Sequence, residues 1–111
     1  MIAVPAHFDG EVYGALRRLD RQRKLAPGLL DRVVPLLARF RAERVPLGRL
    51  ITQAHALGTR FSARDAFYVA LAVRANGELL TSDRALAATA SPLVRVRLID
   101  SRSNKSRARR E

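Results

Sequence analysis

Three acidic residues stand at places where a helix is expected to begin. Asp83 directly follows the apolar run Leu79-Leu80-Thr81, and Asp65 lies three residues after Ser62. Glu11 lies near the start of an amphipathic segment. Clustered carboxylates in a chain without cysteine suit hard ions such as Mg²⁺ or Mn²⁺. Such an ion can activate a water for attack on a phosphodiester and neutralise charge in the transition state, so these residue types predict phosphodiester hydrolysis.

Each acid by itself also has a structural explanation. Asp83 could cap the helix that follows it, a role worth about 1 kcal/mol. Ser62 and Asp65 form an S-x-x-D capping motif. Glu11 lies at the rim of the apolar face of its helix. There its carboxylate could reach into water and interact favourably with the positive end of the helix dipole. The metal hypothesis therefore depends on the three acids being brought together.

Apolar strands that alternate with helices are expected to position these acids. The predicted strands cover residues 2–5, 44–47, 78–81 and 94–99, and the predicted helices cover residues 7–24, 27–42, 50–59, 62–75 and 82–89. This alternation predicts an α/β domain with a mainly parallel sheet. Because ligands bind beyond the carboxyl ends of parallel strands, where the following helices begin, we expect all three acids along one edge of the sheet.

Prolines, glycines and charge alternation set the limits of several elements. Pro27 is well placed to begin the second helix, and Pro35 predicts a kink or break near Val34. The pair Asn76-Gly77 predicts a left-handed helix end. Between residues 94 and 99, apolar residues alternate with arginines, which predicts an edge strand with one face in water.

The chain is strongly basic, with 21 Lys and Arg against 10 Asp and Glu and a net charge of +11. Such a charge attracts polyanions, although the arginine bias of a GC-rich genome explains it equally well. No signal peptide or membrane span is predicted, and the lack of cysteine is compatible with the cytoplasm. We expect one domain over residues 1–100, followed by a disordered basic tail over residues 101–111.

Three blocks of the chain resemble the PIN-domain ribonucleases of the VapC toxin type. Residues 4–19 contain P-x-x-x-x-x-E-V-x-x-A-L, residues 62–72 contain S-x-x-D-A-x-Y-V-A-L-A, and residues 79–87 contain L-L-T-x-D-x-x-L-A. Each block carries an acid where the family has one. The resemblance covers residues 4–99 and implies a PIN-like three-layer α/β/α fold with a mainly parallel sheet.

The resemblance also implies an activity, a cofactor and partners. It implies a Mg²⁺-dependent endoribonuclease, the toxin of a toxin–antitoxin pair, with RNA as substrate and a cognate antitoxin protein as partner. Glu11, Asp65 and Asp83 match the second, third and fourth acids of the family's catalytic, metal-binding set, and Thr81 matches a supporting hydroxyl residue. A homodimer is compatible with this reading, and no membrane partner is expected.

The chain departs from the family pattern at its front. The family's first strand, which is central in its sheet and ends in an acid, has no counterpart before Glu11, so the domain is expected to be N-terminally incomplete. This leaves an alternative open, in which the chain is a catalytically inactive PIN domain that binds antitoxin or RNA without cleavage. A third reading is a basic nucleic-acid-binding module without a metal site.

Overall fold

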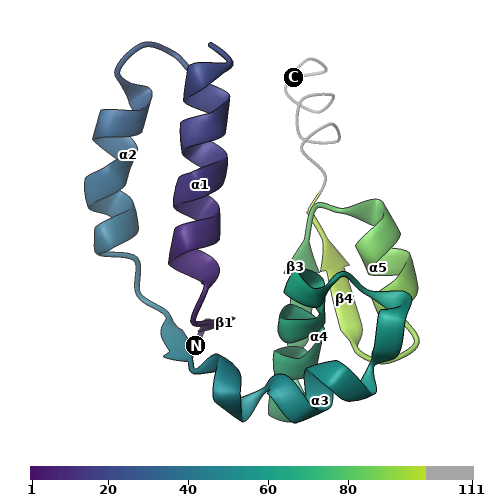
Figure 1. The fold of residues 1–111 in the computed structure, drawn as a ribbon. Helices are drawn as coiled ribbons and strands as arrows, with labels where there is room; N and C mark the ends of the chain where they lie inside the picture. Colours follow the sequence, from purple (N-terminus) through teal and green to yellow (C-terminus); the bar gives the residue numbers. More distant parts are fainter. Residues whose placement is uncertain (100–111) are drawn as a thin grey trace, which may run out of the picture. The chain divides into compact units, whose positions relative to one another are not determined.

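The computed structural model describes residues 1–99 as helices joined by short strands (Figure 1). The chain divides into two compact units, of which the first covers Met1–Arg49 and the second begins at Leu50. Each unit contains one pair of parallel strands. The predicted α/β class and the parallel strand pairing are therefore confirmed. The predicted tail over residues 101–111 lies outside the described residues.

The first unit is a helical hairpin attached to a strand pair. Its elements are β1 (Ala3–Pro5), α1 (Phe8–Arg21), α2 (Leu29–Ala38), β2 (Glu43–Val45) and a 3₁₀ turn, η1 (Leu47–Arg49). Strand β1 pairs with β2 in parallel, with Val4 opposite Arg44. Val4 and Pro5 are buried, whereas neither helix contains a fully buried residue. The apolar face of α1 is therefore only half-covered.

Two expectations about the second helix are wrong. Pro27 does not begin it, because Gly28 has a φ of 78° and helical geometry starts only at Leu29. Of the kink or break expected near Val34, the break is missing, since α2 runs through Pro35 to Ala38. Proline near a helix end removes only one hydrogen bond of the ladder, which the remaining turn tolerates.

The second unit carries most of the buried apolar side chains. Its elements are α3 (Ile51–Ala56), a 3₁₀ turn η2 (Gly58–Arg60), α4 (Ala63–Ala75), β3 (Glu78–Thr81), α5 (Arg84–Ala90) and β4 (Arg95–Leu98). Leu50 and Val69 are completely buried. Helix α4 is the most buried helix of this unit, as its uncharged run predicts, and it packs against α3 and β3.

The ends of α3 and α4 follow local backbone chemistry. Gly58 has a φ of 70°, so α3 ends at Ala56 and not at Thr59 as predicted. Helix α4 ends as expected in a left-handed cap, in which Asn76 has a φ of 49° and the Gly77 N–H donates to the Ala72 carbonyl. This cap turns the chain directly into β3, which carries the Thr81–Asp83 segment at its end.

Strand β4 differs from its predicted burial pattern. It pairs with β3 in parallel, with Val96 opposite Leu79 and Leu98 opposite Thr81. Val96 is half-buried beside the buried Leu79, as alternation predicts, but Leu98 is 40% exposed. Leu98 stands at the last pair of this two-stranded sheet, where β3 contributes the polar Thr81 and not an apolar neighbour.

Candidate metal-binding acids

Glu11 lies in the first turns of α1, where it is linked twice to His7. Its backbone N–H donates to the His7 carbonyl at 3.1 Å. Its carboxylate oxygen Oε1 lies 3.0 Å from His7 Nε2, and each side chain is 23% exposed. Glu11 is therefore a mostly covered carboxylate, and the interpretation of its head as extending freely into water is not supported.

Asp65 occupies the third position of α4. Its backbone N–H donates to Ser62 Oγ at 3.1 Å, so the predicted cap is present. The reciprocal half of a capping box, in which the acid bonds back to the cap residue, is not formed among residues 1–99. In the described part of the chain, the half-buried Asp65 carboxylate makes no ion pair or hydrogen bond of its own.

Asp83 begins α5 directly after β3. Its Oδ1 accepts the Leu86 N–H at 3.0 Å, and its own N–H donates to Thr81 Oγ1 at 3.0 Å. The predicted helix-cap role is therefore confirmed, and Thr81 accepts a hydrogen bond from the backbone of Asp83. A supporting role of Thr81 at a metal site stays a prediction. Within residues 1–99 the cap uses only one of the two carboxylate oxygens, so capping and metal binding are compatible at this residue.

The three predicted acids are divided between the two units. Glu11 belongs to the first unit, and Asp65 and Asp83 belong to the second. Among residues 1–99 no three His, Asp or Glu side chains form a group that could hold a metal ion. The donor set nevertheless fits Mg²⁺ or Mn²⁺ by its chemistry, because it offers only carboxylate oxygens. The metal-binding role of the trio stays a prediction.

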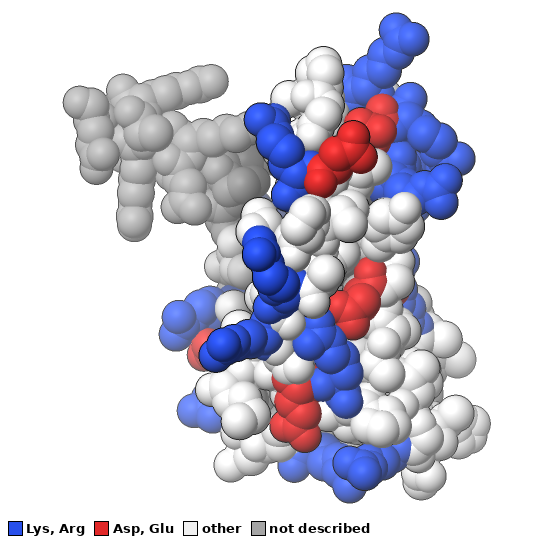
Figure 2. Space-filling view, turned by 90° about the vertical axis from the view of Figure 1, so that its left-hand side faces the viewer, with Lys and Arg blue, Asp and Glu red and all other residues white. Residues whose placement is uncertain are grey.

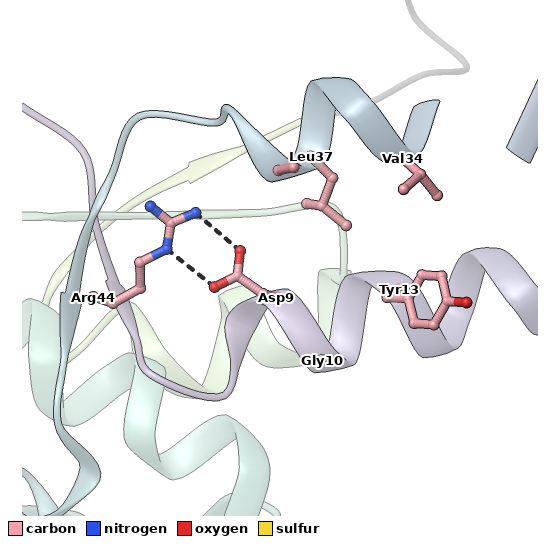
Figure 3. Close-up of a pocket in the computed structure, with 7 residues that line it drawn as sticks. Asp9, Gly10, Tyr13, Val34, Leu37 and Arg44 are labelled. Atoms are coloured by element: carbon pink, nitrogen blue, oxygen red, sulfur yellow. Dashed lines mark hydrogen bonds and ion pairs between the residues drawn. The ribbon is translucent and has the colours of Figure 1, made fainter. Parts of the chain in front are cut away.

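Asp9 and Arg44 form a bidentate ion pair that the sequence does not predict. Arg44 Nε donates to Asp9 Oδ2 at 3.0 Å, and Nη2 donates to Oδ1 at 2.9 Å (Figure 3). Arg44 Nη1 also donates to the carbonyls of Phe40 and Ala42. The pair joins the start of α1 to β2 across 35 residues of sequence. Neither residue lies in a local motif that could have predicted this contact.

An open pocket of about 550 Å³ lies between α1 and α2, and this ion pair lies at one end of it (Figure 3). The pocket is lined by Asp9, Gly10, Tyr13, Val34, Leu37, Ala38 and Arg44. Because the two charges at its end neutralise each other, the pocket offers mainly an apolar surface. It is therefore a poor candidate for phosphodiester chemistry.

The Asp9–Arg44 pair predicts a pH dependence of stability. The hydrogen bonds from Arg44 lower the pKa of Asp9 below its usual 3.8. A lowered folded-state pKa contributes stability above the unfolded pKa, and that stability is lost as the pH falls through the folded pKa. We expect the Asp9→Asn variant to be less stable than the native chain near pH 6, and the difference to shrink as the pH falls below the usual carboxyl range and through the lowered pKa of Asp9. Urea denaturation across this pH range measures it, and a constant difference would contradict it.

None of the helices within residues 1–99 is long and apolar enough to cross a membrane.

The chain is similar in sequence to known ribonucleases. The chain is 37% identical over 83 residues to Ribonuclease VapC3 from each of two strains of Mycobacterium tuberculosis. The aligned region covers 75% of this chain, which spans about 61% of the length of these relatives. No family model matches the chain, and no solved structure matches it significantly. The predicted resemblance to VapC-type ribonucleases is confirmed by these relatives.

Proposed function

We propose that this chain, a member of the VapC-type PIN ribonucleases, is an endoribonuclease toxin that cleaves RNA with a carboxylate-bound Mg²⁺ or Mn²⁺ ion. The observation that carries the proposal is its likeness over 83 residues to two proteins named as ribonucleases. The net charge of +11 supports the choice of substrate, because a positive field concentrates RNA near the protein.

Glu11, Asp65 and Asp83 are the proposed metal ligands and catalytic residues. When bound, the ion would supply an activated water and positive charge beside the phosphate. The chain's own part is to hold the carboxylates in place before the ion binds. Thr81 Oγ1 holds the backbone N–H of Asp83, and the Leu86 N–H holds its Oδ1. Asp65 lies in the first turn of α4. Ser62 Oγ accepts the backbone N–H of Asp65 and so stabilises this turn.

The partners proposed for the chain follow from the same family. A cognate antitoxin protein would bind it and restrain the cleavage, and the substrate would be RNA in the cytoplasm. A homodimer is also part of this proposal. Co-expression with a candidate antitoxin and size-exclusion chromatography of the purified proteins would test both associations.

Removal of the metal tests the proposal directly. We expect the purified chain to cleave single-stranded RNA in the presence of Mg²⁺, and an excess of EDTA to lower the rate about 100-fold or more. Re-addition of Mg²⁺ or Mn²⁺ should restore the rate. Gel analysis of a labelled RNA measures the cleavage.

Two outcomes would contradict this proposal. Cleavage that EDTA does not lower would exclude a metal-dependent mechanism. RNA binding without any cleavage would favour the alternative of a catalytically inactive domain. A protein that was denatured and refolded, and then shows the same activity per molecule, controls for contaminating nucleases.

A further inference from the structure

The C-terminal half of α1 concentrates positive charge on the surface. Residues 17–24 contain five Lys or Arg and one Asp, and all of these charged residues are exposed. Figure 2 shows Lys and Arg side chains gathered in its upper part, at the end of the helical hairpin where α1 finishes. Part of this charge has a structural explanation, because cations favour the negative end of a helix dipole.

Two of these arginines share the side of α1 that carries Glu11. At 100° per residue, Arg18 lies about 20° and Arg21 about 80° from Glu11 around the helix axis. Along the axis they lie about 10 Å and about 15 Å beyond it. The half-buried apolar stripe of α1, which includes Val12 and Leu19, lies on the other side of Glu11. Arg18 and Arg21 therefore continue the line of side chains that begins at Glu11, and we call these two arginines the basic row.

In the part of the chain that the structure describes, the guanidinium groups of Arg18 and Arg21 have no other partner. Among residues 1–99, neither Arg18 nor Arg21 makes an ion pair or a side-chain hydrogen bond. Arg17 differs, because its guanidinium lies over the Tyr13 ring at 5.8 Å from the centroid. Gly14 lies between Glu11 and Arg18, and a Cβ built there would meet no atom within 4 Å in the described chain. The row is therefore open along its length.

We propose that Arg18 and Arg21 bind backbone phosphates of the RNA strand that is cut at Glu11, so that α1 guides the strand toward Glu11. This inference rests on the proposed ribonuclease function. Guanidinium groups suit phosphate oxygens, which they can bind in a bidentate manner. Because such contacts recognise no base, the row supplies affinity and direction without sequence specificity.

Binding measured without metal tests this proposal separately from cleavage. The full chain is titrated in EDTA against a labelled single-stranded RNA with 2′-O-methyl groups, and fluorescence anisotropy is followed at several KCl concentrations. We expect Arg18→Gln with Arg21→Gln to weaken binding roughly tenfold at about 0.1 M salt and to reduce the salt slope by about 1.4, as for two lost phosphate contacts. The doubly lysine-substituted protein, R18K with R21K, should retain most of the affinity.

The matched control removes two exposed arginines of α2 and its end, as Arg32→Gln with Arg39→Gln. We expect this variant to bind within about twofold of the native chain. Equal weakening by both double variants would overturn the proposal, because it would assign the effect to net charge alone. Unchanged binding of R18Q with R21Q would also overturn it and would leave only the helix-dipole role.

The two proposals fail in distinguishable ways. If R18Q with R21Q binds RNA normally while EDTA still abolishes cleavage by the native chain, only the basic row is wrong. If cleavage by the native chain ignores EDTA, the metal-dependent function is wrong, whatever the arginines do.

Discussion

The Asp65→Asn variant is expected to lose at least about 100-fold of the RNA cleavage rate, equivalent to about 2.7 kcal/mol of transition-state stabilisation. Asparagine keeps the shape of the side chain but removes the charge that a divalent ion needs. The cap on α4 should survive, because it uses the backbone N–H of residue 65 and the hydroxyl of Ser62. The thermal midpoint should therefore change little while the activity falls.

Matched variants separate the role of Asp65 in catalysis from its place in a helix. Asp31 is also an acid in the first turn of a helix, α2, and it is exposed. Asp31→Asn should leave cleavage unchanged. Ser62→Ala should cost about 1 kcal/mol of stability through the lost cap and should leave most of the activity. Full activity of Asp65→Asn under saturating Mg²⁺ would refute the metal role of this residue.

The sequence predicts those features of this chain that depend on neighbours along it. Ser62 caps α4, Asn76 ends it in the left-handed region, and Asp83 caps α5, each as expected. The hydrogen bonds of these motifs join residues that are only two to five positions apart. Donor and acceptor therefore both lie within one short stretch of sequence, where they can be recognised. The same holds for α4, whose uncharged run predicts its burial.

Contacts between distant parts of the chain could not be foreseen in this way. The Asp9–Arg44 pair joins residues 35 apart and follows no periodicity that either segment shows. Pro27 predicts the start of α2 too early, because the left-handed backbone at Gly28 delays the helix to Leu29. For the candidate site, the sequence predicts the helix positions of Asp65 and Asp83 correctly, while the proposed joint role of the three acids rests on likeness to ribonucleases.

Leu50 is completely buried and is expected to be a principal determinant of stability in the second unit. Its side chain lies at the start of α3, which packs against α4. The Leu50→Ala variant removes three heavy atoms from a close-packed interior and leaves a cavity. We expect it to lower the free energy of unfolding by about 2–5 kcal/mol. Urea denaturation followed by circular dichroism measures this loss.

The neighbouring residue provides a matched control for this prediction. Ile51 is also a large aliphatic residue, but its side chain is 55% exposed. Ile51→Ala should change the free energy of unfolding by less than about 1 kcal/mol, because little apolar surface is lost and alanine favours the helix. Equal losses for the two variants would mean that Leu50 is not part of a packed core. A large loss at Leu50 alone would locate this core beneath α4, the helix that carries Asp65, and would tie the stability of the second unit to the geometry of that carboxylate.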